Sequence, residues 1–125
     1  IVILQQSKKQ KKTIYKEMLV KKKLNLNEFT KVIQTNIGKP INIYSCDSYL
    51  FELIASIDGA ILLDKGFNIL SFGEMIKNSD DTPDVAEAGS RTLAAANASV
   101  FGLSIKVSED GDISIFEDGS PVIKL

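Results

Sequence analysis

The sequence predicts an α/β fold in which a mixed β-sheet is flanked by helices and ends in a β-meander. Apolar runs typical of strands occur both before and after segments with helical spacing. Hairpin signals are too frequent for an all-parallel sheet, so a mixed sheet is expected. The chain has 125 residues, of which 44% are apolar, and we expect residues 1–125 to form one domain with a single core.

The first part of the chain predicts strands and helices in alternation. Ile1–Leu4 is apolar throughout and indicates a buried strand, and apolar residues at helical spacing predict a helix over residues 12–22. A capping box at residues 25–28 begins a second predicted helix, which ends at Gly38. Alternation over Ile41–Tyr44 predicts a short strand.

The second part predicts a helix, a hairpin, another helix and the meander. Asp47 or Ser48 is suited to cap the first of these helices. Two apolar runs around Asp64-Lys65-Gly66, within residues 60–72, predict the hairpin, and the later helix is expected over residues 90–101. The meander is expected to have strands beginning at Leu103, Ile113 and Val122, with turns at Asp110-Gly111 and Asp118-Gly119.

The net charge of −1 combines two halves of opposite charge. Residues 1–39 carry ten lysines against two glutamates, a net charge of +8, whereas residues 40–125 carry five basic and fourteen acidic side chains, a net charge of −9. The lysine-rich segment 1–39, called the basic front below, is either a solvated helix face or a surface for an acidic partner. It lacks interleaved aromatic residues and a DNA-reading motif, so nucleic acid is not expected to bind through this domain.

The chain has no histidine and one cysteine, Cys46. This composition excludes a Ser-His-Asp triad, a structural zinc site and an internal disulfide, and it suits the cytoplasm. Any metal would be held by carboxylates and ligand oxygens, which favours Mg²⁺ or Mn²⁺. No apolar run approaches the roughly 20 residues that span a bilayer. The opening Ile1-Val2-Ile3-Leu4, without methionine, favours a domain taken from a longer protein.

The stretch that begins at Gly89 carries the main functional signal. Gly89, Ser90 and Arg91 precede an alanine-rich helix pattern, and its small side chains would let the helix lie close against a sheet. Backbone N–H groups and the positive end of the helix dipole then point outward together. Arg91 adds a planar fork of donors that suits phosphate oxygens. The stretch therefore predicts either an anion-binding helix start or an ordinary helix with a Ser90 N-cap and a surface arginine.

Three stretches occur in order: Asp58-Gly59-Ala60, then Gly89-Ser90-Arg91-Thr92-Leu93-Ala94-Ala95, then Ser108-Glu109-Asp110. In order and approximate spacing they resemble the diadenylate cyclase (DAC) domain family, to which the N-terminal nucleotide-binding domain of DisA belongs. That family's signature is an Asp-Gly-Ala stretch, then a Gly-Thr-Arg-His-Arg-Ala-Ala stretch, then a Ser-Glu-Glu-like stretch. The resemblance extends more weakly from about Gly38 to Gly119.

The resemblance implies a mixed α/β fold that binds ATP with Mg²⁺ or Mn²⁺. It also implies a homo-oligomer, because in that family two facing domains condense two ATP molecules into cyclic di-AMP. By position, Asp58 would be the catalytic residue, near the metal and the attacking hydroxyl. The nucleotide would be bound by Gly59, Ala60, Gly89, Ser90, Arg91, Thr92 and Glu109.

The middle stretch departs from the family signature, since Thr92 and Leu93 stand where the family has histidine and arginine. Leucine cannot hold phosphate charge, and losing one charged donor costs roughly a hundredfold in rate. Leu93 stands at helical spacing with Ala96 and Val100, which is typical of a helix that packs on a core.

Three functions remain open. The leading hypothesis is a sensor or regulatory domain that binds ATP or a cyclic dinucleotide; the alternatives are an active diadenylate cyclase and a structural or interaction domain with a basic front. The first two hypotheses require that Asp58 and the helix start at Gly89 face one cavity of nucleotide size.

Overall fold

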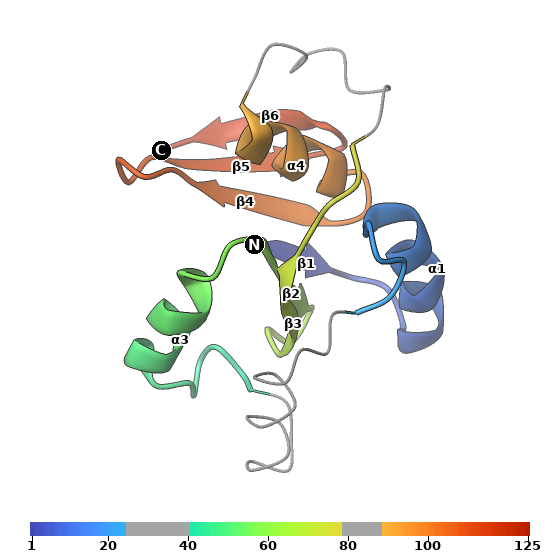
Figure 1. Ribbon diagram of the computed structural model, residues 1–125, viewed down its shortest axis with the longest axis horizontal. Helices are drawn as coiled ribbons and strands as arrows, with labels where there is room; N and C mark the ends of the chain where they lie inside the picture. Colours follow the sequence, from blue (N-terminus) through green and yellow to red (C-terminus); the bar gives the residue numbers. More distant parts are fainter. Residues whose placement is uncertain (25–40, 79–88) are drawn as a thin grey trace.

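The chain forms one six-stranded sheet with helices on both faces, as the computed structural model of residues 1–24, 41–78 and 89–125 shows (Figure 1). In chain order the elements are β1 (Val2–Leu4), α1 (Lys8–Met18), α3 (Ser48–Ala55), β2 (Ala60–Asp64), β3 (Ile69–Glu74), α4 (Ser90–Ala98), β4 (Leu103–Val107), β5 (Ile113–Glu117) and β6 (Ser120–Lys124). The strand order is β3-β2-β1-β4-β5-β6. Because β1 pairs in parallel with β2 and antiparallel with β4, the sheet is mixed, and it ends in the predicted β4–β5–β6 meander.

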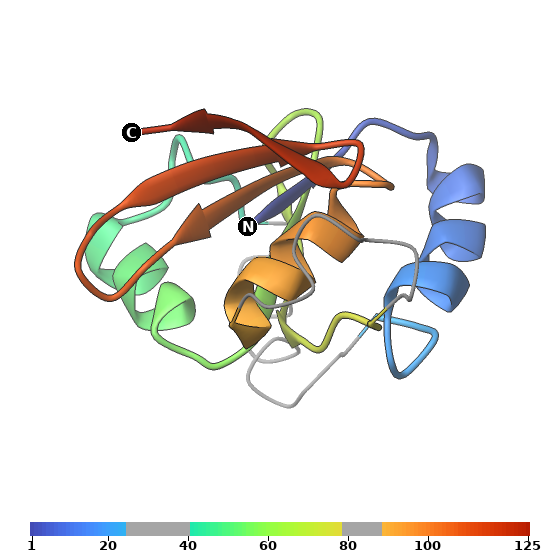
Figure 2. The same cartoon turned by 90° about the horizontal axis from the view of Figure 1, so that it is seen from above.

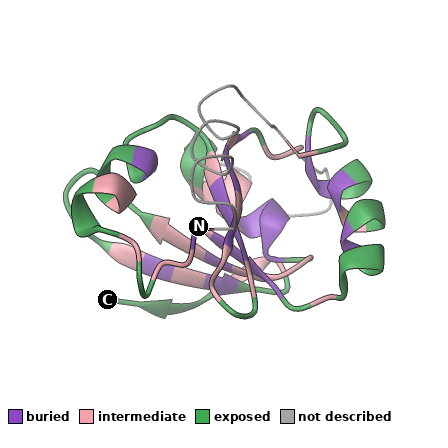
Figure 3. Ribbon diagram, turned by 90° about the horizontal axis from the view of Figure 1, so that it is seen from below, coloured by how far each residue is buried: buried purple, intermediate pink, exposed green. Residues whose placement is uncertain are grey.

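The central strands are buried on both faces of the sheet. Val2 and Leu4 of β1 pack in one cluster with Tyr15 of α1, whereas Ile3 packs in another cluster with Ile54 of α3. Figure 3 shows this central part of the sheet as its most buried region, between α1 and α3. A strand covered on both faces needs apolar residues at every position, which explains the uninterrupted apolar run at the start of the chain.

Helix α4 lies against one face of the meander, as seen from above in Figure 2. Ala96 of α4 is fully buried and clusters with Phe116 of β5, with Leu93 packed beside them. Ser99, just after the helix, accepts a hydrogen bond from the Gly119 N–H at 2.8 Å and so ties the end of α4 to the β5–β6 turn. The prediction that small side chains bring this helix close to the sheet is confirmed, although α4 ends at Ala98 rather than at 101.

Helix α1 is shifted toward the N-terminus from the predicted 12–22. It begins after Ser7, whose hydroxyl accepts from the Gln10 N–H while the Gln10 side chain accepts from the Ser7 N–H, a complete capping box. It ends at Met18 because Leu19 is extended and forms a bridge with Ile76. The periodicity was correct, but pairing with the segment after β3 ends the helix early.

The strand predicted over Ile41–Tyr44 is wrong. Between this segment and the rest of the described chain, only one isolated bridge forms, from Asn42 to Asn68. The Asn42 side chain donates to Asn68 at 3.0 Å, and its oxygen accepts from the Tyr44 N–H at 2.9 Å, so a local turn competes with the strand. The predicted helix that starts at residue 25 and ends at Gly38 lies outside the described residues.

The remaining elements in the described part of the chain follow the predictions, except that β6 begins at Ser120 and not at Val122. Asp47, one of the two expected caps, accepts from the Tyr49 N–H at 2.8 Å and begins α3. The β2–β3 hairpin forms around Asp64, and Asp118-Gly119 makes the β5–β6 turn with φ angles of 51° and 85°, as a type I′ turn requires. Within the described residues, no helix has the length and apolar character needed to cross a membrane.

Because Tyr15 is buried against the sheet, its ionisation should make the stability of the protein depend on pH at high pH. Burial, and then the carboxylates of Glu74 and Asp64, raise the pKa of Tyr15 from 10.0 to about 12. Above pH 10 the unfolded chain therefore loses this proton while the folded chain keeps it. We therefore expect the ionisation of Tyr15 to lower the free energy of unfolding by about 2 kcal/mol between about pH 10 and about pH 12. Urea unfolding over this range checks the prediction, and Tyr15→Phe should lack this part of the decline; an equal decline in both proteins would contradict it.

Candidate anion-binding site

The start of α4 is an open helix N-terminus. Gly89 is the N-cap, with extended φ and ψ angles of −65° and 166°, and its carbonyl accepts from the Leu93 N–H at 3.1 Å. Ser90 is the first helical residue, so the alternative of a Ser90 N-cap is wrong. The first N–H groups of a helix have no partner within it, and the helix dipole adds positive potential at the same place.

A hollow of about 350 Å³ lies at this helix start. Its described lining is Gly89, Ser90, Arg91, Thr92, Lys106 and Glu109. The hollow is open to water, because most of these residues are exposed. It brings together five of the eight residues that the sequence singled out, from two stretches that lie apart in the chain.

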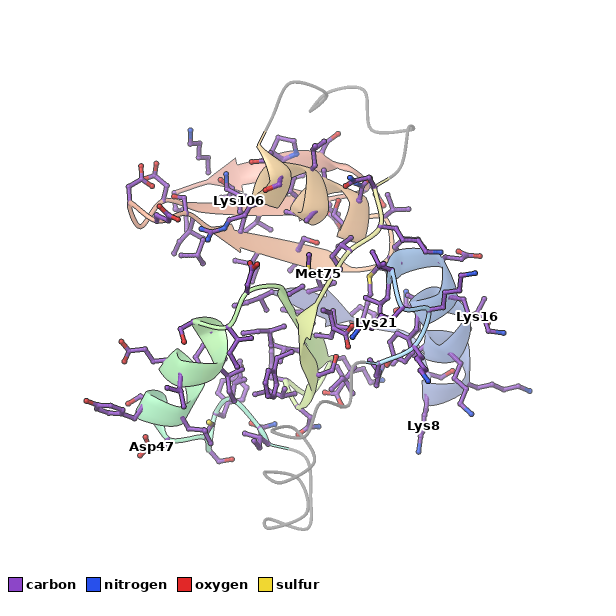
Figure 4. The ribbon with its side chains drawn as sticks, viewed as in Figure 1. Lys8, Lys16, Lys21, Asp47, Met75 and Lys106 are labelled. Atoms are coloured by element: carbon purple, nitrogen blue, oxygen red, sulfur yellow. The ribbon has the colours of Figure 1, made fainter. Side chains whose placement is uncertain are left out.

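Lys106 is the member of this hollow that sequence reasoning missed. It lies on β4 (Figure 4). Its Nζ donates a hydrogen bond to Thr92 Oγ1 of α4 at 3.0 Å. The signal was present in the alternation of β4, since Lys106 lies between Ile105 and Val107 and so faces the opposite side of the sheet from them. Recognising it required knowing that α4 covers that side.

Arg91 already has an anionic neighbour. Its Nη2 lies 3.6 Å from Glu109 Oε1, and the two side chains are 60% and 87% exposed. An ion pair this exposed contributes between about 0 and 1 kcal/mol to stability. Arg91 is therefore available to a ligand, provided that the ligand competes with Glu109.

The turn after β4 fixes the backbone on which Glu109 stands. The Ser108 hydroxyl donates to the Asp110 carboxylate, and the Ser108 N–H donates to the Asp112 carbonyl at 2.9 Å. The hydrogen bond from Ser108 also lowers the pKa of Asp110. Ser108 and Asp110 thus shape the turn, while the neighbouring Glu109 reaches toward Arg91.

The Asp58-Gly59-Ala60 stretch joins α3 to β2. Asp58 is exposed, and Ala60 pairs with Glu74 across the hairpin. Gly59 has a φ of +113°, and a Cβ at this position would lie 2.6 Å from the carbonyl carbon of Gly73. This close approach to β3 gives Gly59 a packing role. None of the three residues is among the described residues that line the hollow, so this hollow is not the shared cavity expected for Asp58 and the helix start. The case for a phosphate site therefore depends on the helix start, Arg91 and Lys106, without Asp58.

The carboxylates offer a limited site for Mg²⁺ or Mn²⁺. No group of three or more metal-ligating side chains occurs among the described residues. Mg²⁺ is commonly held by one or two carboxylates together with substrate phosphates, so Glu109 fits such a role once a phosphate ligand is present. Asp58, the metal ligand that the sequence suggests, does not line this hollow within the described chain.

Comparison with models of protein families, with curated protein sequences and with solved structures gives no match. The functional interpretation therefore depends on the residues of this chain and their geometry.

Proposed function

We propose that this chain is a divergent DAC-like domain that binds an adenine nucleotide or a cyclic dinucleotide, as a sensor or regulatory module of a cytoplasmic protein. One observation carries the proposal: the start of α4, Arg91 and Lys106 converge on one hollow. Backbone N–H groups, a guanidinium and an ammonium are the groups that bind phosphate oxygens in proteins.

The composition of the hollow indicates which part of a nucleotide it holds. Apart from Gly89, its described lining is polar or charged, with no aliphatic or aromatic wall against which a base would stack. Its volume of about 350 Å³ is at the small end of the range for ligand sites. We therefore assign the phosphates to this hollow and expect the base to lie outside it.

The position of Leu93 favours binding over condensation. Leu93 packs against Ala96 and Phe116 in the cluster between α4 and the meander, so it has been recruited to the core. Thr92, the other departure from the family signature, accepts a hydrogen bond from Lys106. A missing charged donor at a phosphoryl-transfer site costs about 3 kcal/mol of transition-state stabilisation.

Mg²⁺ or Mn²⁺ is part of the proposal for a polyphosphate ligand. Glu109 would hold the ion together with phosphate oxygens, and the ion would neutralise ligand charge there. By the family resemblance Asp58 would be a second ligand, which would require it to approach the hollow.

Calorimetric titration with ATP, ADP and cyclic di-AMP, with and without Mg²⁺ or Mn²⁺, tests the proposal. Because a charge-assisted hydrogen bond is worth about 1.5–3 kcal/mol, we expect Arg91→Ala and Lys106→Ala each to weaken binding by about tenfold or more. Lys65→Ala removes an exposed cation of the β2–β3 turn and should leave the affinity unchanged. Chromatography of the same samples should recover ATP unchanged.

Two results would count against nucleotide binding. One is the absence of any heat with all three nucleotides at high micromolar concentration. The other is an affinity that neither Arg91→Ala nor Lys106→Ala alters. Formation of cyclic di-AMP at any protein concentration would instead favour the active cyclase.

An exposed lysine face supports a second candidate, an interaction domain for an acidic partner. Helix α1 buries Tyr15 and Met18 while Lys8, Lys9, Lys12 and Lys16 stay exposed, at the end of the molecule away from Lys106 (Figure 4). Binding through this face would weaken with salt and would be unaffected by substitutions at Arg91.

A further inference from the structure

The exposed lysines of α1 lie on one side of the helix. They are Lys8, Lys9, Lys12 and Lys16. At about 3.6 residues per turn their positions fall within an arc of about 100°, and the row extends about 12 Å along the helix axis. On the other side of the helix, Tyr15 and Met18 are buried in the cluster that contains β1. The four ammonium groups therefore form one lysine face, at the α1 end of the molecule (Figure 4).

The stability of the fold does not explain where these lysines stand. Lys8 and Lys9 are the first two residues of α1, and the first turn of the helix contains no acidic residue. The N-terminus of a helix carries the positive end of the helix dipole, so cations at this place destabilise the helix. An anionic partner would remove this cost, because its charge would neutralise both the lysines and the helix end.

The turn after α1 adds an apolar tip to the lysine face. The Lys22 N–H donates to the Leu19 carbonyl at 3.0 Å, so Val20 and Lys21 are the central residues of a turn. The Val20 N–H donates to the Met75 carbonyl at 3.0 Å, which fixes the turn to the chain that follows β3. Because Leu19 is extended and fully buried, Val20 points the opposite way, and it is 55% exposed.

The charge and the apolar tip together indicate the kind of partner. Residues 1–24 carry eight lysines and one glutamate, a net charge of +7. Clusters of lysines on an amphipathic helix bind anionic lipid headgroups, and neighbouring aliphatic side chains enter the boundary between headgroups and acyl chains. Nucleic-acid bases stack on exposed aromatic rings, whereas Tyr15, the one aromatic residue of α1, is buried. An anionic bilayer therefore matches both features.

We propose that α1 and the turn after it dock this domain on an anionic bilayer surface. The ammonium groups of the lysine face lie among the headgroups, and Val20 lies at the acyl boundary. The inference rests on the second candidate function, the interaction domain, and names its acidic partner. It does not depend on the hollow at the start of α4. The cytoplasmic leaflet of a cell membrane provides a surface of this charge.

Sedimentation with lipid vesicles tests the proposal. The vesicles contain phosphatidylcholine alone or phosphatidylcholine with phosphatidylserine. We expect the unmodified protein to bind only the anionic vesicles, and less tightly at high salt. Since each lysine near such a surface contributes a factor of about five, Lys16→Gln should weaken binding about fivefold. Lys124→Gln is the matched control, because it removes an exposed lysine of β6 and should leave binding unchanged.

Val20→Ala tests the apolar tip separately from the charge. The substitution removes two carbons from the acyl boundary, so it should weaken vesicle binding about tenfold without changing the salt dependence. Val122→Ala removes the same atoms from β6, where Val122 is 52% exposed, and should have no effect on binding. Equal losses in the two valine variants would overturn the placement of Val20 at the bilayer.

The double variant Lys8→Gln/Lys9→Gln separates docking from a structural role. Vesicle binding should fall about 25-fold, while the midpoint of urea unfolding stays unchanged or rises, because two cations leave the positive end of the helix dipole. A fall in both quantities would instead give these lysines a structural role and overturn the proposal.

Three further outcomes decide the matter. The proposal is overturned if the unmodified protein does not bind anionic vesicles at low salt. It is also overturned if polyglutamate or a single-stranded oligonucleotide binds as tightly as the vesicles do and is unaffected by Val20→Ala, because the partner would then be an acidic polymer. Unchanged vesicle binding by Arg91→Ala would support it. Nucleotide titrations report on the hollow at α4, so either proposal can fail while the other stands.

Discussion

Replacing Gly59 with alanine is expected to destabilise the fold by about 3 kcal/mol. Two independent costs contribute to this loss. The φ of +113° lies in a region that an L side chain rarely adopts, and the added Cβ would lie 2.6 Å from the carbonyl carbon of Gly73. The Gly73 atom belongs to the main chain and a Cβ has no torsional freedom relative to its own backbone, so the contact could be relieved only if the chain at Gly59 and β3 moved apart. Urea unfolding followed by circular dichroism measures the change.

Gly89→Ser is the control for this experiment. Its φ of −65° suits any residue, a Cβ there meets nothing within 4 Å, and serine is a good N-cap. The stability should change by no more than about 0.5 kcal/mol. A Gly59→Ala protein that is stable but has lost nucleotide affinity would contradict the packing role of Gly59. It would indicate that Gly59 contacts the ligand instead.

Phe72→Ala should cost about 3–5 kcal/mol, a large share of the 5–15 kcal/mol that stabilises a typical domain. Phe72 is the largest of the fully buried side chains in the described residues, and it packs on the α3 side of the sheet with Ile54 and Leu63. Truncation leaves a cavity that the surrounding strands cannot fill. The midpoint of urea unfolding should fall with little change in slope.

Tyr49→Ala is the matched control for this truncation, because it also removes an aromatic ring but one that is 82% exposed on α3. It should change the stability by less than about 0.5 kcal/mol. Similar losses in the two variants would mean that Phe72 is not the centre of this cluster, and that the packing between α3 and the sheet differs from the one described.

Most of the local structure could be predicted because its causes are local. The Asp47 cap of α3 and the Asp118-Gly119 turn depend on hydrogen bonds and φ angles within a few residues. The packing role of Leu93 followed from helical spacing alone, and its cluster with Ala96 and Phe116 confirms that prediction.

The predictions that failed were decided by competing contacts. Ile41–Tyr44 has the alternation of a strand, but the side chain of Asn42 forms a turn and reaches across to Asn68. Helix α1 ended before its predicted limit because the chain at Leu19 bridges to Ile76, far along the sequence. The spacing of apolar residues does not indicate which distant residues will pair with a segment.

The sequence by itself determined the mixed sheet, the meander and the helix start at Gly89, because caps, turns and periodicity act over a few residues. Only the tertiary structure decided that Lys106 joins Arg91 and Glu109, and that Gly59 packs on Gly73. The physical reason is that strand pairing and helix docking bring together side chains that are distant in the chain. These side chains therefore come into contact only once the strands have paired in their native register.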